Sequence, residues 1–214
     1  MISVNVVGRQ QQVPTFKCAL IGHEGCGKSS LVKRHSTGAF VQQYVPTRGL
    51  VVTNLQFNTT RGPICFETWE AELGEYEKSS ISFFRDLKCA ILMFDVGLRD
   101  PLINFDTYYS LFKRVPSYAL KTICGNKTDI QMSNKNPLRL TVFNFTKMSV
   151  KANSNIDKPF VYFARRLLKD RTLEFIPKTD MLPAQVKLSD QDLLLRRELA
   201  SKALANEKEK AKDR

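Results

Sequence analysis

The chain has 214 residues, of which 43% are hydrophobic and 25% charged, values typical of a globular protein with a sizeable core. No apolar run approaches the roughly 20 residues needed to span a bilayer, and no cysteine near the C-terminus offers a prenylation site, so membrane attachment is not expected. The formal net charge of +12 favours acidic partners, but the cations are scattered. A well-solvated surface is therefore the simpler interpretation, and direct nucleic-acid binding lacks a reading motif.

Apolar runs alternate with segments of helical spacing along the chain. Residues 1–12 are polar and Gln-rich and predict a flexible tail. The pattern then predicts strands over 16–21, 51–58, 64–69, 89–96, 120–124 and 142–148. It predicts helices over 28–37, 101–115 and 159–168.

This alternation predicts an α/β fold with a doubly wound, mostly parallel sheet of six strands and helices on both faces. The run at 89–96 (CAILMFDV) is nearly all apolar, which is typical of a central strand covered on both sides. The expected domain spans 13–175. Residues 176–214 are expected to form a linker and a C-terminal helix that begins near Ser189.

A phosphate-binding pattern, G-x-x-x-x-G-K-S, follows the first predicted strand and opens the first predicted helix. Its glycines let backbone N–H groups converge on phosphate oxygens, and the helix N-terminus adds positive potential. Lys28 is expected beside the β- and γ-phosphates, and Ser29 is expected to ligate Mg²⁺. Glu24 places an unfavourable carboxylate near the phosphates. The predicted contacts are His23, Glu24, Gly25, Cys26, Gly27, Lys28, Ser29 and Ser30.

A second pattern, N-K-x-D, follows the strand predicted to end at Cys124. An ionised Asp129 can accept two N–H bonds from guanine, a pair that adenine does not offer. Ser149, Val150 and Lys151 follow the last predicted strand and are expected to close over the base. The alternative for this N-K-x-D pattern is an ordinary polar turn. The pattern lies about 100 residues after the phosphate loop, however, and this placement favours a guanine site formed by Asn126, Lys127 and Asp129.

With both patterns in place, the sequence resembles the Ras superfamily, whose fold is that of P-loop NTPases, and within it the Ran family of nuclear-transport GTPases. The similarity runs from about Val13 to Phe175. Its distinctive segments are 13–17, 32–35, 37–38, 61–64, Trp69, 89–90, 93–96, 124–127, 158–160, 164–165 and 173–175.

The resemblance implies binding of GTP and GDP with Mg²⁺, held by Ser29 and by Thr47, which would also sense the γ-phosphate. The alternative for Thr47 is a simple loop hydroxyl. The resemblance also implies that Phe40 packs on the guanine and that Tyr44 to Thr47 form switch I. The nucleotide contacts implied here are Phe40, Val41, Gln42, Gln43, Tyr44, Val45, Pro46 and Thr47. Importin- and exportin-type receptors and regulators of the Ran family are the implied partners, in nucleus and cytoplasm.

The segment after Trp69 departs from the family pattern. Glu70 replaces an aspartate of the Mg²⁺ shell, and its added methylene is expected to displace the carboxylate. Leu73 stands where a glycine would donate its N–H to the γ-phosphate. Gly74 or Glu75 occupies the place of the glutamine that orients the attacking water, depending on alignment. We therefore expect very slow hydrolysis.

Two functions fit these observations. The first is a Ran-type switch enzyme that still cycles with weakened chemistry. The second is a pseudo-GTPase that holds nucleotide and acts as a competitor or scaffold for Ran partners. The C-terminal segment also differs from the family, because its charges nearly balance instead of being acidic. Contacts that need an acidic tail are therefore not expected.

Overall fold

The computed structural model describes residues 12–72, 74–75, 80–98, 105–130 and 144–177. These residues belong to one of two compact units, which divide between Pro177 and Lys178. The predicted tail over 1–11 and the C-terminal helix near Ser189 lie outside the described residues. Within those residues, no helix is both long enough and apolar enough to cross a membrane.

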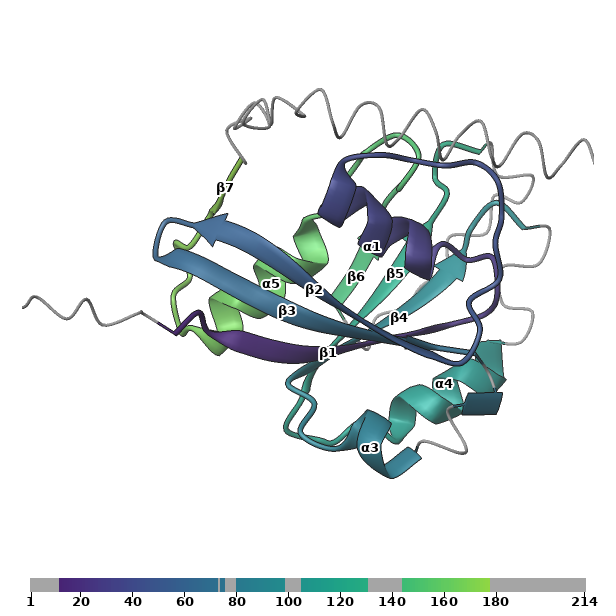
Figure 1. Ribbon diagram of the computed structural model, residues 1–214, viewed down its shortest axis with the longest axis horizontal. Helices are drawn as coiled ribbons and strands as arrows, with labels where there is room; N and C mark the ends of the chain where they lie inside the picture. The colour runs from purple at the N-terminus through teal and green to yellow at the C-terminus, as the bar shows by residue number, and fades with distance from the viewer. Residues whose placement is uncertain (1–11, 73, 76–79, 99–104, 131–143, 178–214) are drawn as a thin grey trace, which may run out of the picture. The chain divides into compact units, whose positions relative to one another are not determined.

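A single mostly parallel sheet organises the chain, with the strand order β6-β5-β4-β1-β3-β2-β7 (Figure 1). Strands β1, β3, β4, β5 and β6 pair in parallel, whereas β2 runs antiparallel to both of its neighbours. The strands are β1 (Thr15–Gly22), β2 (Leu50–Thr59), β3 (Gly62–Ala71), β4 (Cys89–Asp95), β5 (Leu120–Asn126), β6 (Asn144–Lys147) and β7 (Phe175–Ile176). The predicted doubly wound α/β fold is confirmed.

The predicted count of six strands is wrong, because β7 adds a seventh. Its two residues pair with Asn58 and Thr59 of β2. Two residues are too short to carry a period-2 signal, and their partner lies more than 100 positions earlier. Helix α3 (Ser80–Phe84) was also not predicted, for the same reason of length.

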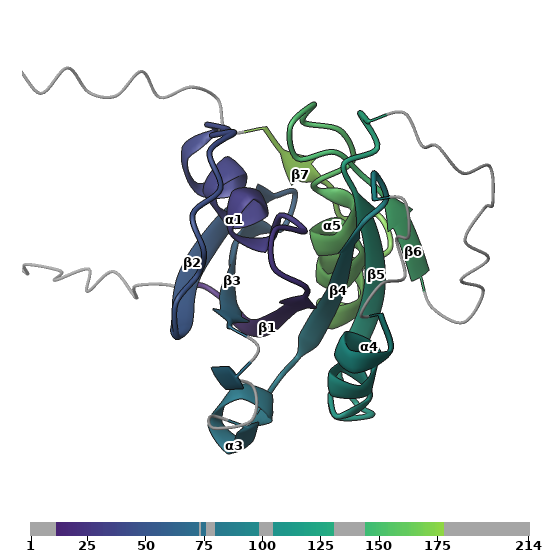
Figure 2. The ribbon, with the colours of Figure 1, turned by 90° about the vertical axis from the view of Figure 1, so that its right-hand side faces the viewer.

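Helices cover both faces of the sheet, with α1 (Lys28–Thr37) and α5 (Lys158–Leu167) on one face and α3 and α4 (Phe105–Lys113) on the other (Figures 1 and 2). The two hydrophobic cores follow from strand alternation. In β4, Cys89, Ile91 and Met93 pack into the core of the first face. Ala90 and its alternating neighbours pack into the core of the second face. A strand that is apolar throughout is therefore buried on both sides, as predicted.

Glycines set the ends of α1. Gly27 precedes the helix with a φ of 105°, and Gly38 follows it with a φ of 72°. The N–H of Gly38 donates to the carbonyl of Arg34 at 2.9 Å, which closes the last turn. Left-handed backbone favours glycine, so the sequence fixes both boundaries of this helix. The helix therefore starts directly from the loop that follows β1.

Candidate functional site

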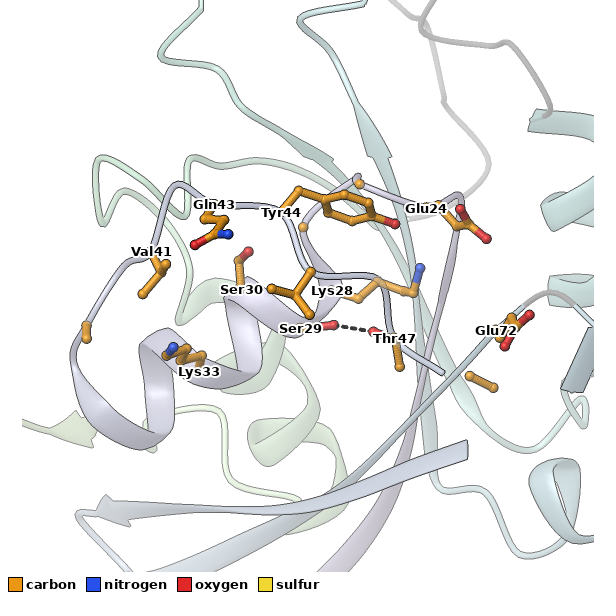
Figure 3. A pocket seen from close by; sticks show the side chains of 15 residues that line it. Glu24, Lys28, Ser29, Ser30, Lys33, Val41, Gln43, Tyr44, Thr47 and Glu72 are labelled. Atoms are coloured by element: carbon orange, nitrogen blue, oxygen red, sulfur yellow. Dashed lines mark hydrogen bonds between the residues drawn. The ribbon is translucent and has the colours of Figure 1, made fainter. Parts of the chain in front are cut away.

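Loops at the carboxyl-terminal edge of the parallel strands enclose a cleft, one part of which is drawn in Figure 3. The loops after β1, β5 and β6, the segment between α1 and β2, and the end of β3 all contribute. We call the part lined by Lys28 and Thr47 the Lys28 side, and the part lined by Asn126 and Asp129 the Asp129 side. The two parts are continuous, because six residues line both: Gly25, Gly27, Ser30, Val41, Gln43 and Tyr44.

The loop after β1 wraps tightly around a buried ammonium. Lys28 is only 8% exposed, and its Nζ donates to the carbonyls of Gly22 at 2.7 Å and His23 at 3.1 Å. A Cβ on Gly22 would lie 2.2 Å from the Met93 carbonyl oxygen, so no larger residue fits there. This arrangement gives backbone amides and a cation at the N-terminus of α1, which is suited to an anion such as phosphate.

A cluster of oxygens lies next to Lys28. The hydroxyls of Ser29 and Thr47 are 2.7 Å apart, and Ser29 Oγ donates to Glu70 Oε2 at 2.7 Å. Mg²⁺ takes oxygen ligands at about 2.1 Å in an octahedron, whose adjacent ligands are about 3 Å apart. The two hydroxyls therefore fit as neighbouring ligands of a Mg²⁺ ion, with Glu70 holding Ser29 from behind.

Glu70 reaches this cluster despite its longer side chain. It is 4% exposed, and burial raises the pKa of its carboxyl, while the hydrogen bond from Ser29 and the charge of Lys28 lower it. The structure accommodates the added methylene within the buried end of β3 and places the Glu70 carboxylate against Ser29. Glu70 remains able to orient Ser29.

Asn126 joins the two sides of the cleft. This side chain is 2% exposed; its Nδ2 donates to the Cys26 carbonyl at 2.8 Å, and its Oδ1 accepts from the Val150 N–H at 3.1 Å. A Cβ on Gly27 would lie 2.3 Å from Asn126 Nδ2. The loop after β1 and the loop after β6 are therefore held in register by one amide.

A carboxylate on the Asp129 side is held in place by hydrogen bonds. Asp129 Oδ1 accepts from Ser149 Oγ at 2.5 Å, and Ser149 Oγ in turn accepts from the Ala152 N–H at 2.9 Å. This leaves the second carboxylate oxygen of Asp129 for a ligand. Phe40, half-buried against the core of the first face, lines the same side together with Lys151.

A sequence model of the Ras family matches residues 17–169. The chain belongs to the Ras family. The match covers the loop after β1, the Ser29–Thr47 pair and both loops of the Asp129 side. A Ras-family domain is a GTP-binding molecular switch, and its members bind GTP and GDP, typically with Mg²⁺.

Most predicted contacts of the Ras-family site line the cleft, but some do not. On the Lys28 side lie Glu24, Gly25, Gly27, Lys28, Ser29, Ser30, Val41, Gln43, Tyr44, Val45 and Thr47. On the Asp129 side lie Phe40, Gln42, Asn126, Lys127, Asp129, Val150 and Lys151. The linings omit His23, Cys26, Pro46 and Ser149. Ser149 donates to the Asp129 carboxylate from outside the lining. Cys26 belongs to the loop after β1, but its side chain is buried, which raises the pKa of its thiol.

The residues at the expected catalytic position are only partly described. Leu73 lies outside the described residues. Gly74 is exposed and Glu75 half-buried, both in helical conformation, and the Glu75 N–H donates to the Glu72 carbonyl at 3.0 Å. Neither side chain supplies the neutral amide that positions water in active members of the family.

Several residues in or next to the cleft were not predicted, and two of them carry charges that bear on its function. Asp95, 4% exposed at the end of β4, forms an ion pair with Lys127 at 2.7 Å and accepts from the Gly97 N–H at 2.8 Å. A carboxylate that ends an otherwise apolar run was the available signal, because that position meets the ligand edge of the sheet. Glu72, which lines the Lys28 side, left no such signal in the sequence.

Proposed function

We propose that this chain is a Ran-type guanine-nucleotide-binding switch of nucleocytoplasmic transport whose intrinsic GTP hydrolysis is very slow. The observation that carries the nucleotide part is the continuous cleft. In it the loop after β1, which holds Lys28, is joined through buried Asn126 to the loop after β6, where Ser149 donates to Asp129. The distinctive segments shared with the Ran family support the transport role. Importin- and exportin-type receptors and Ran regulators are the proposed partners, in nucleus and cytoplasm.

Calorimetry on the full chain with Mg²⁺ tests the nucleotide part. We expect binding of GDP at submicromolar affinity and no detectable binding of ADP, because adenine cannot donate the pair of N–H bonds that Asp129 accepts. An Asp129→Ala variant should lose GDP binding while keeping the far-ultraviolet circular dichroism of the wild type. Equal affinity for ADP and GDP would contradict the proposal.

Slow hydrolysis is expected because the segment after β3 offers no glutamine at the position of Gly74 or Glu75. A single-turnover assay with γ-labelled GTP should give a rate below the order of 10⁻⁴ s⁻¹ that is typical of unstimulated small GTPases. An activating protein should raise this hydrolysis rate only slightly. Turnover at the rate of ordinary family members would refute the claim of slow hydrolysis, but not that of nucleotide binding.

A second candidate is a pseudo-GTPase that competes for Ran partners or holds them without turning over. The same missing glutamine favours it, because nucleotide-binding groups are present while the water-positioning group is not. Titration of a purified importin-type receptor with the full chain, loaded in turn with GDP and with a nonhydrolysable triphosphate, distinguishes the roles. Displacement of Ran from the receptor would support the competitor, and no binding in either state would exclude both transport roles.

A further inference from the structure

Two carboxylates lie at one end of the cleft. Glu24, in the loop after β1, and Glu72, directly after β3, both line the Lys28 side and are both exposed. Figure 3 shows Glu24 and Glu72 at the end of the cleft toward which the Lys28 ammonium points. Lys33, the other lysine of this lining, lies further along α1, away from the two carboxylates. The base is expected on the Asp129 side, so this end would receive the outermost phosphate.

Glu72 is held in place. Its Oε2 accepts from the Gly49 N–H at 3.3 Å, and its own N–H donates to the Gly49 carbonyl at 3.1 Å. These bonds extend the pairing of β2 and β3 by one residue beyond Ala71. The carboxylate is thereby kept beside the segment that carries Thr47.

The charge of Glu24 acts within the cleft. Burial first and then the Glu24 carboxylate raise the pKa of Tyr44, which lines both sides. Among the described residues, neither Glu24 nor Glu72 takes part in an ion pair. Lys28 is already donating to two carbonyls. The end of the cleft therefore presents two negative charges without a dedicated cation for each.

We propose that Glu24 and Glu72 make this cleft select guanosine diphosphate over the triphosphate. Their carboxylates repel a third phosphate group. The base would meet Asp129 and Asn126, and the first two phosphates would meet the backbone amides of the loop after β1. This inference rests on the proposed function, because it takes guanine nucleotide as the occupant. One like charge near a phosphate oxygen at a partly exposed surface changes affinity on the order of tenfold, so two change it by roughly 10- to 100-fold.

The test compares affinities for GDP and for guanosine imidotriphosphate with Mg²⁺, measured by competition against a fluorescent GDP analogue. The full-length variants are Glu24→Gln, Glu72→Gln and the double variant. Glu174→Gln is the matched control, because it removes the same charge from an exposed side chain that lines neither side of the cleft. Both target side chains are exposed, so the variants should fold, which their thermal midpoints verify.

The wild type should bind the triphosphate roughly 10- to 100-fold more weakly than GDP. The double variant should narrow this ratio at least about tenfold by tightening triphosphate binding, with GDP affinity nearly unchanged and Glu174→Gln like the wild type. Raising salt from 50 mM to 500 mM should narrow the wild-type ratio through screening. Equal wild-type affinities, or a ratio that the double variant leaves unchanged, would overturn this inference but not the proposed function. Failure to bind either nucleotide would overturn both.

Discussion

Gly27 offers the sharpest test of how the site is assembled, because a single methyl group there meets two separate obstacles. Its φ of 105° disfavours any side chain, and the added Cβ of Gly27→Ala would lie 2.3 Å from Asn126 Nδ2. That amide is buried and bonded to the Cys26 carbonyl and the Val150 N–H. The substitution should therefore strain the backbone and also displace the side chain that joins the two sides of the cleft.

The two costs can be estimated separately. Alanine in left-handed backbone costs about 1–2 kcal/mol. Moving Asn126 leaves one or two buried polar groups unsatisfied, at about 1–3 kcal/mol each. We expect Gly27→Ala to lower the free energy of unfolding by about 3–5 kcal/mol. Gly38→Ala is the matched control, because its φ is 72° and its Cβ would meet nothing within 4 Å. It should cost only the backbone term, about 1–2 kcal/mol.

Urea unfolding of the nucleotide-free chain, followed by the fluorescence of its single tryptophan, measures both values. A double-mutant cycle with Asn126→Ala adds a stricter test. If the methyl group acts by displacing the Asn126 amide, Gly27→Ala should cost about 2 kcal/mol less when that amide is already absent. Additive effects, or equal costs for Gly27→Ala and Gly38→Ala, would refute the reasoning.

Three further changes probe other parts of the site. Asp95→Asn removes the charge that pairs with Lys127 but keeps an oxygen that can accept from the Gly97 N–H. Release of a fluorescent GDP analogue should therefore accelerate about tenfold. An unchanged release rate would show that the ion pair does not help to hold the nucleotide. Burial raises the pKa of the Glu70 carboxyl in the folded state above its unfolded value of 4.5. The free energy of unfolding of the nucleotide-free wild type should therefore fall, relative to that of Glu70→Gln, as the pH rises from 4.5 through the folded pKa. A difference between the two free energies that stays constant from pH 4.5 to 8 would contradict this. Lys17→Met removes an ammonium that lies 3.6 Å from the Trp69 ring centroid and also donates to the carbonyls of Ser82 and Arg85. This substitution should lower the free energy of unfolding by about 1–2 kcal/mol, whereas Lys88→Met, at an exposed side chain, should not. Equal costs for the two variants would exclude these contacts as the cause.

The sheet was largely predictable because its strands are short apolar runs between clear breakers. The expected strand over 89–96 is observed as Cys89–Asp95, and the expected helix over 28–37 has the observed bounds of α1. For α1 the reason is local, since glycines in left-handed backbone flank both ends. Both nucleotide patterns were recognisable for the same reason, because each combines fixed residue types with a defined place after a strand.

What the sequence could not predict depends on contacts between distant segments. β7 exists only because β2 pairs with it, and α3 is too short for a helical period. The role of Asp95 depends on the position of Lys127, directly after the neighbouring strand β5. The reach of Glu70 to Ser29 depends on how deeply the end of β3 is buried. These properties are set by packing, which composition and spacing do not encode.

The two ends of the cleft differ in how far they are organised before a ligand arrives. On the Asp129 side and in the Lys28 loop, the polar groups are already oriented by buried partners, as Asn126 and Ser149 show, so binding a base and a diphosphate requires little reordering. At the outer end, the Glu24 and Glu72 carboxylates are exposed, and one long hydrogen bond, from the Gly49 N–H at 3.3 Å, holds that of Glu72. Affinity should therefore come mainly from the organised part. A protein built this way would retain nucleotide through its base and its first two phosphates, and would hold the triphosphate less tightly than the diphosphate.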